Sequence, residues 1–142
     1  MDSEQVNRIR MRGHHLFCII MMQNWTLWGP RFWENVKEYK KRLENPNVVI
    51  EIVRYCCDTC AFCPCNIGGR CELYDFREGG NRIDLEILGQ LGLNIGDEIT
   101  SGELMRLLKE RFPSMPSICI WGCGVTDSGC TEGLEKLKSM KL

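Results

Sequence analysis

The hydrophobic pattern in the first half of the chain predicts short strands alternating with helices. Residues 8–12 alternate arginine with apolar side chains, which is typical of a short strand. Gly13 interrupts that pattern, and residues 14–25 are apolar on nearly every side, so we expect a buried helix. Residues 30–45 carry apolar side chains at helical spacing with basic ones opposite, which predicts an amphipathic surface helix. β-Branched residues dominate residues 48–55 and predict a second strand.

The second half predicts three more helices, separated by irregular stretches. These helices are expected at residues 83–91, 101–111 and 131–140. Thr100 stands three residues before Glu103, which is the spacing of a capping box at a helix start. Residues 56–81 and 113–130 show no hydrophobic periodicity, so something other than a core must order them.

Together these elements predict the α+β fold class. We expect a mostly helical small domain with a short two-stranded sheet and cysteine-rich irregular metal-binding loops. The chain has 142 residues, and domains cluster near about 100–150 residues. Residues 1–142 are therefore expected to form a single cysteine-rich domain.

Charge and hydropathy narrow the classes of partner. Lys and Arg together number 18 and Asp and Glu 19, which gives a formal net charge of -1. Because nucleic-acid binding needs a basic excess, we expect no nucleic-acid partner. No apolar stretch approaches the roughly 18 residues of a membrane span, so we expect no membrane association. The apolar run at residues 16–22 is short and no small-residue cleavage site follows it, so we expect a cytoplasmic location.

The unusual feature of the composition is its ten cysteines. In a reducing cytoplasm, clustered cysteines are more often metal ligands or redox groups than disulfides. Six of them crowd into one short stretch: Cys56, Cys57, Cys60, Cys63, Cys65 and Cys71. A disulfide-stapled loop is the alternative, but so short a stretch rarely offers the opposed Cβ vectors that disulfides need.

The central group has the spacing of a metal site. Two residues separate Cys57 from Cys60 and Cys60 from Cys63, and Pro64 follows, which matches part of a ferredoxin-like run. A fourth ligand would come from Cys71 or from farther away. This spacing favours an iron–sulfur cluster, although four thiolates at looser spacing also satisfy zinc. A redox dithiol of Cys60 and Cys63 is a further alternative.

The remaining cysteines form a looser constellation. Three of them lie near the carboxyl end: Cys119, Cys123 and Cys130. Cys18 could add a fourth sulfur, and on a helix it would lie one turn after His14 and His15. A buried imidazole needs a partner, which a metal or a cluster sulfur would provide. Alternatively, one histidine is a hydrogen-bonded core residue and Cys18 is a small buried hydrophobe.

Four segments of the sequence resemble one known family. Arg12–Cys18 corresponds to the motif R-x-H-H-L-L-C, and Asp58–Cys71 contains D-x-C-x-x-C-P and G-x-C. Leu91–Leu104 and the three carboxyl-terminal cysteines also correspond. The family is the group called domain of unknown function 1284, for which iron–sulfur binding has been suggested. The resemblance covers about residues 8 to 132.

The resemblance implies a set of ligands at the matching positions. The cofactor and metal ligands would be Cys18, Cys60, Cys63, Cys71, Cys119, Cys123 and Cys130, with His14 and His15 as further metal ligands. Cys57 ranks lower, because it looks like an addition to the family pattern, as do Cys56 and Cys65. Three residues separate Cys119 from Cys123 where the family usually has two.

Three functions are compatible with these residues. The favoured one is an iron–sulfur protein of electron transfer or redox sensing, with one or two clusters of the [4Fe–4S] type and an unidentified redox partner. The second is a zinc-stabilised binding or structural module whose ion orders the irregular stretches. The third is a cluster-dependent enzyme with an open iron site and polar candidates His14, His15, Asp58 and Asp75. The resemblance brings no known reaction.

Overall fold

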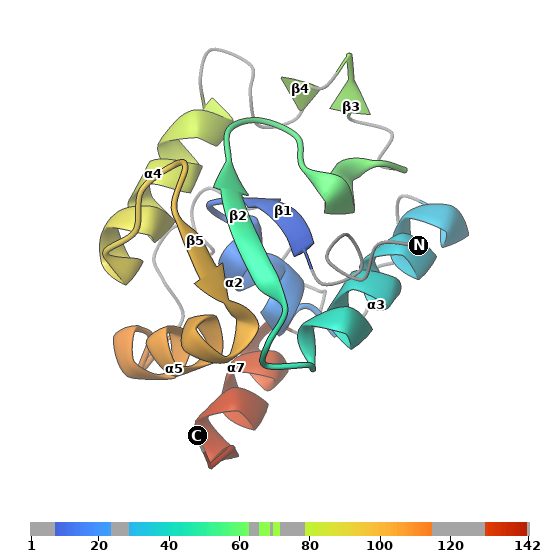
Figure 1. Ribbon diagram of the computed structural model, residues 1–142. Helices are drawn as coiled ribbons and strands as arrows, with labels where there is room; N and C mark the ends of the chain where they lie inside the picture. Colours follow the sequence, from blue (N-terminus) through green and yellow to red (C-terminus); the bar gives the residue numbers. More distant parts are fainter. Residues whose placement is uncertain are drawn as a thin grey trace.

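The computed structural model describes six stretches of the chain (Figure 1). They are residues 8–23, 29–62, 66–68, 70–71, 79–114 and 130–141, with the backbone alone described at 70–71 and 79–81.

A three-stranded sheet forms the centre of the fold (Figure 1). Its strands are β1 (Arg8–Arg12), β2 (Val49–Val53) and β5 (Glu98–Thr100), in the order β1-β2-β5. β1 runs parallel to β2, and β5 runs antiparallel to β2. Both strands predicted by alternation and β-branching are confirmed. The third strand has three residues, too few for a hydrophobic pattern to predict it.

One face of this sheet is apolar and the other is charged. Ile9, Ile50 and Ile99 stand opposite one another across the three strands and are buried. Arg8 on the other face forms ion pairs with Glu51 and Glu98. The period of two residues in a strand therefore separates core from solvent, as alternation requires.

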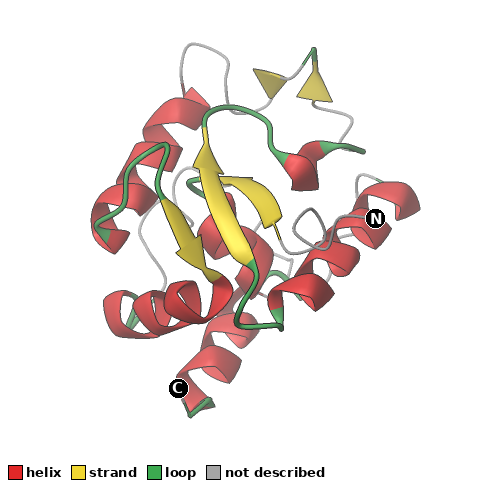
Figure 2. Ribbon diagram, viewed as in Figure 1, coloured by secondary structure: helices red, strands yellow, loops and turns green. Residues whose placement is uncertain are grey.

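Five helices within the described residues lie around the sheet (Figure 2). They are α2 (His15–Met21), α3 (Pro30–Leu43), α4 (Gly79–Leu91), α5 (Ser101–Arg111) and α7 (Cys130–Ser139). All five correspond to predicted helices. The Thr100 side chain accepts a hydrogen bond from the backbone N–H of Glu103, so the predicted amino-terminal cap is present.

Helix α2 lies at the centre of the core, behind the sheet in Figure 1. Leu16, Phe17, Ile19 and Met21 are all buried. The ring of Phe17 packs 4.9 Å from that of Phe112, which follows α5. Nearly all-round burial is what an apolar helix without a polar face requires.

Helix α2 is shorter than the predicted helix over residues 14–25. It ends at Met21, and Met22 has φ -59 and ψ 125. Lys40 on α3 donates hydrogen bonds to the carbonyl oxygens of Ile19 and Ile20, at 3.0 and 2.9 Å. A cation from another element thus satisfies the last carbonyls of α2, which is a tertiary contact that no local pattern reveals.

The cysteine-rich stretch after β2 contains short regular pieces. A 3-10 turn, η1 (Asp58–Cys60), is followed by an antiparallel pair, β3 (Asn66–Ile67) with β4 (Arg70–Cys71). The predicted α+β class is confirmed. The predicted small sheet has three strands, and β3 with β4 forms a separate two-stranded sheet. Within the described residues, no helix has the length and apolarity needed to cross a lipid bilayer.

Candidate metal centre

Parallel pairing of β1 with β2 brings two distant segments together. Arg12 at the end of β1 is in register with Val53 at the end of β2. The chain leaving β1 begins α2, whose first residue is His15, and the chain leaving β2 leads to Cys57 and η1. Because both segments leave the carboxyl edge of neighbouring parallel strands, their side chains meet beyond that edge.

His15, Cys57 and Cys60 form a compact group at this edge. Their ligand atoms all lie within 4.8 Å of one another. His15 Nδ1 is 3.1 Å from Cys57 Sγ and 3.9 Å from Cys60 Sγ, and the two sulfurs are 4.0 Å apart. Both cysteines are buried, and His15 is partly exposed. One imidazole and two thiols in this arrangement could hold a metal ion.

Thr59 supports the group from within η1. Its hydroxyl oxygen lies 2.9 Å from His15 Nδ1 and 3.2 Å from Cys57 Sγ, and the residue is fully buried. The backbone N–H of Cys60 donates to the carbonyl oxygen of Cys57 at 2.9 Å. This short turn holds both sulfurs on one side, as a two-residue spacing between cysteine ligands requires.

Hydrogen bonds shift the pKa values of the Cys57 and Cys60 thiols in opposite directions. Burial alone would raise the pKa of Cys57. Hydrogen bonds from Cys60, His15 and Thr59 outweigh burial and hold the pKa of Cys57 well below its usual value. The pKa of Cys60 is raised, because its thiol hydrogen-bonds Cys56 and Cys57 and is itself buried. The pair therefore favours one thiolate and one thiol, and an ion bound by both sulfurs would displace the Cys60 proton.

The neighbouring His14 has a different environment. Its Nδ1 lies 2.6 Å from Asp84 Oδ1, and Asp84 also forms a buried ion pair with Arg12 at 3.0 Å. Burial, helped by the nearby His15 and Arg12, lowers the pKa of His14 to about 4. His14 is therefore neutral near pH 7, and its Nδ1–H donates a hydrogen bond to the carboxylate of Asp84.

The structure brings together some of the predicted ligands. His15 and Cys60 lie in the group, and Cys57, which ranked lower from the resemblance, lies between them. The spacing Cys57-x-x-Cys60 was the sequence signal for this pair. Cys18 and Cys130 are described but are not members of the group. Of the other predicted ligands, Cys63, Cys119 and Cys123 lie outside the described residues, and Cys71 is described by its backbone alone.

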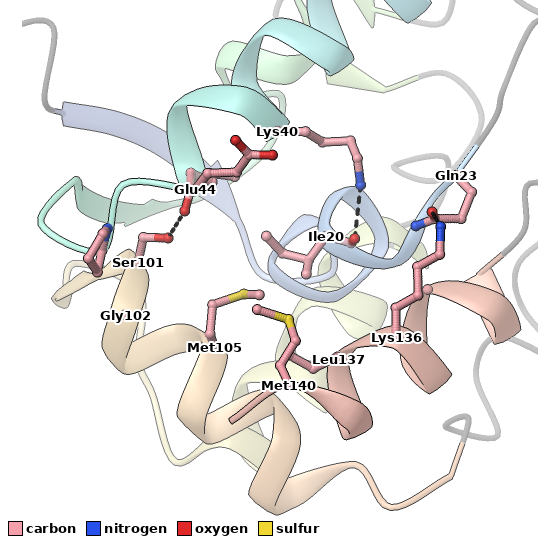
Figure 3. Close-up of a pocket in the computed structure, with 13 residues that line it drawn as sticks. Ile20, Gln23, Lys40, Glu44, Ser101, Gly102, Met105, Lys136, Leu137 and Met140 are labelled. Atoms are coloured by element: carbon pink, nitrogen blue, oxygen red, sulfur yellow. Dashed lines mark hydrogen bonds between the residues drawn. The ribbon is translucent and has the colours of Figure 1, made fainter. Parts of the chain in front are cut away.

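A separate cleft lies between α2, α3, α5 and α7 (Figure 3). Its volume is about 530 Å³, and Met105, Leu137 and Met140 contribute apolar walls. Lys40 points into this region but is bonded to the end of α2 (Figure 3). None of the three grouped ligands lines this cleft, so it is distinct from the metal group.

Comparison with known proteins matches most of the chain to one family. Residues 28–128 match the family described as protein of unknown function (DUF1284). This span includes Cys57 and Cys60, whereas His15 precedes it. No curated protein and no solved structure matches the chain.

Proposed function

The chain belongs to the DUF1284 family of proteins of unknown function, as its sequence predicted, and we propose that it binds a single transition-metal ion. The ligands are His15, Cys57 and Cys60, and zinc is the ion that fits them best. The bound ion would tie the start of α2 to η1. Its chemistry is that of a structural cross-link, since an ion held by both segments resists their separation.

The spacing of the three ligand atoms carries this proposal. Zinc binds cysteine sulfur at about 2.3 Å and histidine nitrogen at about 2.0–2.1 Å in a tetrahedron. Ligand atoms of such a tetrahedron lie about 3.4–3.8 Å apart, by geometry from those bond lengths. The separations of 3.1, 3.9 and 4.0 Å between Nδ1 and the two sulfurs are close to these edges. Binding requires shifts of only a few tenths of an ångström.

A tetrahedral ion needs a fourth ligand. We assign this position to Cys56, which directly precedes Cys57 and whose thiol contributes to the raised pKa of Cys60. Its sulfur does not lie within 4.8 Å of all three grouped ligand atoms, so a bound ion would have to draw it toward them. The resulting Cys3His set is one that structural zinc sites use, whereas a water in that position would be the arrangement of catalytic sites. Reduced thiols fit the proposed cytoplasmic location: those described are Cys18, Cys56, Cys57, Cys60 and Cys130.

The experiment compares metal content among matched cysteine variants. Protein purified with a reductant is analysed for zinc and iron and then titrated with Zn²⁺ against a competing chelator. We expect Cys57→Ser, Cys60→Ser and His15→Ala each to lose one equivalent of bound ion relative to the unsubstituted protein. Cys18→Ser is the control and should keep it. Unchanged metal content in the three ligand variants would contradict the proposal, and Cys56→Ser decides the fourth ligand.

An iron–sulfur cluster is the second candidate, supported by the run of Cys57, Cys60, Cys63 and Pro64. In a [4Fe–4S] cluster these thiolates would bind different irons, so their sulfurs would lie farther apart than ligands of one ion. Such a cluster would serve electron transfer or redox sensing with an unidentified redox partner. Anaerobically purified protein would then be brown and would bleach with dithionite. Colourless protein with zinc and no iron would reject this candidate.

A further inference from the structure

Asp84 on α4 holds the segment that precedes the ligand His15. Its side chain is 2% exposed and accepts hydrogen bonds from two neighbouring residues of the β1–α2 turn. Arg12 Nε lies 3.0 Å from Oδ2, and Arg12 Nη2 lies 3.0 Å from the same oxygen. The backbone N–H of His14 and its Nδ1 lie 2.9 and 2.6 Å from Oδ1. Both carboxylate oxygens are therefore fully used by this turn.

Gly13 lies between Arg12 and His14 and packs directly against the backbone of Asp84. A β-carbon at Gly13 would lie 2.5 Å from the backbone carbonyl oxygen of Asp84, which is far inside van der Waals contact. The turn thus rests directly on the backbone of α4 and is bonded to its carboxylate on both sides. Residues 12–14 have little freedom to move relative to α4.

The restraint on His14 also limits the position of His15, through the peptide bond that joins them and a contact between their rings. His15 follows His14 directly, and the two imidazole rings meet edge to face with centroids 4.5 Å apart. The carboxylate holds His14 on its own side, so His15 is the histidine that faces Cys57. A buried ion pair is a weak source of net stability, and in some proteins it instead fixes how two segments pair.

We propose that Asp84 is the positioning residue of the metal centre: by bonding Arg12 and His14 it directs His15 toward the two thiols. This inference rests on the proposed function, in which His15 is a ligand. Asp84 touches no ligand atom itself. Outer carboxylates that hydrogen-bond a ligand histidine directly orient it, and their removal typically weakens metal binding by about 10- to 100-fold. Asp84 acts one residue farther out, through His14.

The test uses the full chain with Zn²⁺ and Co²⁺ as probes. Asp84→Asn keeps the side-chain shape but lacks the charge and one acceptor. We expect it to weaken Zn²⁺ binding by about 10-fold, the lower end of the range for carboxylates that bond a ligand directly. The matched control is Ser101→Ala, which removes another buried polar group, one that donates to the carbonyl oxygen of Leu43. The control should bind Zn²⁺ like the unsubstituted protein.

Co²⁺ spectra separate positioning from general destabilisation. Loss of His15 from the ion should shift the ligand-field bands of the Asp84→Asn protein while the sulfur-to-cobalt charge-transfer intensity remains. Ser101→Ala should leave both unchanged. If Asp84→Asn binds Zn²⁺ with unchanged affinity and spectrum, or if both variants weaken binding alike, the positioning role is wrong.

A second variant guards against loss of folding. Arg12→Met with Asp84→Leu removes both buried charges together, and apolar replacement of a buried ion pair is often neutral or stabilising. The backbone N–H and the ring of His14 lose their acceptor in this variant, so circular dichroism first checks its fold. This double variant should fold and should show the same weakened Zn²⁺ binding. Unchanged binding in the folded double variant also overturns the inference.

A readout without metal distinguishes this inference from the proposed function. If the unsubstituted protein binds no ion through His15, the proposed function fails. The contact between His15 and Cys57 can still be measured in metal-free protein by the alkylation rate of Cys57 with iodoacetamide, mapped by mass spectrometry. Asp84→Asn should shift that rate in the same direction as His15→Ala, whereas Ser101→Ala should not. A rate unchanged by Asp84→Asn would reject the positioning role.

Discussion

At the scale of single residues, adjacent histidines have opposite surroundings. His14 is buried against Asp84 and Arg12, whereas His15 is partly exposed and lies 3.1 Å from Cys57 Sγ. Neighbouring residues at the start of a helix point in different directions, so one chain segment serves both a buried ion pair and a ligand group. The two histidines therefore have separate roles: His14 bonds Asp84, and His15 lies beside Cys57.

The first prediction concerns the stability of the metal-free protein in acid. The pKa of His14 is about 4 in the fold against 6.5 for an ordinary histidine. Between these values the unfolded chain binds a proton that the folded chain does not, so stability falls as the pH drops from about 6.5 to 4. The loss reaches about 3 kcal/mol at the lower end. Urea unfolding at pH 7, 6, 5 and 4.5 measures it.

The variant His14→Gln isolates this contribution from those of His15 and Asp84. Burial alone would raise the pKa of Asp84, but the hydrogen bond from His14 and the charge of Arg12 hold it below its usual range. Protonation of Asp84 therefore extends the loss of stability to still lower pH. The dependence between pH 6.5 and 4 should flatten in the variant. An equally steep dependence there would assign the effect to other groups.

At the scale of elements, close packing of α7 against α2 depends on one glycine. A β-carbon at Gly133 would lie 1.9 Å from the backbone carbonyl oxygen of Met21. No side chain can fit there, so the helices approach at the level of their backbones. By contrast, nothing lies within 4 Å of a β-carbon at Gly89 on α4.

The second prediction compares these glycines. We expect Gly133→Ala to lower the free energy of unfolding by at least about 2 kcal/mol, because α7 must move away from α2. Gly89→Ala should raise it by about 0.5–1 kcal/mol, since alanine favours a helix interior. Denaturant unfolding of both variants at neutral pH gives the values. Equal effects of the two substitutions would show that α7 does not pack as described.

The third prediction concerns the start of α5. Thr100→Ala removes the oxygen that accepts from the backbone N–H of Glu103 and should cost about 1 kcal/mol of stability. Thr100→Ser keeps that oxygen and is the control. Thermal unfolding followed by circular dichroism measures both. A loss in the serine variant as large as in the alanine variant would point to the threonine methyl group instead of the cap.

At the scale of the whole molecule, the edge of the sheet joins segments far apart in the sequence. Besides the metal group, Asp58 of η1 accepts hydrogen bonds from the backbone and guanidinium of Arg10 in β1, at 2.9 and 3.1 Å to the nearest atoms. An ion bound at His15, Cys57 and Cys60 would add a stronger link between the same two segments.

The fourth prediction follows from this link. Anything that binds only the folded state stabilises it, and free Zn²⁺ at 1,000 times its dissociation constant contributes about 4 kcal/mol. Chelation should therefore lower the midpoint of thermal unfolding of the zinc-loaded protein. The chelator should change the midpoint of Cys60→Ser much less. A midpoint that is insensitive to chelation in the unsubstituted protein would show that no ion supports the fold.

The sequence by itself determined the local elements, because their causes lie within a few residues. Alternation in Arg8–Arg12, the helical spacing after Pro30 and the Thr100 cap each act over short distances and were predicted correctly. Membership of the family was likewise visible in short motifs. The two-residue spacing of Cys57 and Cys60 already placed two sulfurs on one turn.

Only the tertiary structure decided which distant residues meet. The parallel register of β1 with β2 places His15 beside Cys57. His14 instead forms a hydrogen bond with Asp84 of α4. Neither outcome follows from spacing along the chain, because adjacent histidines look alike until a partner from another element distinguishes them. Contacts between segments separated by tens of residues depend on how the whole chain packs, and that packing selects the ligands.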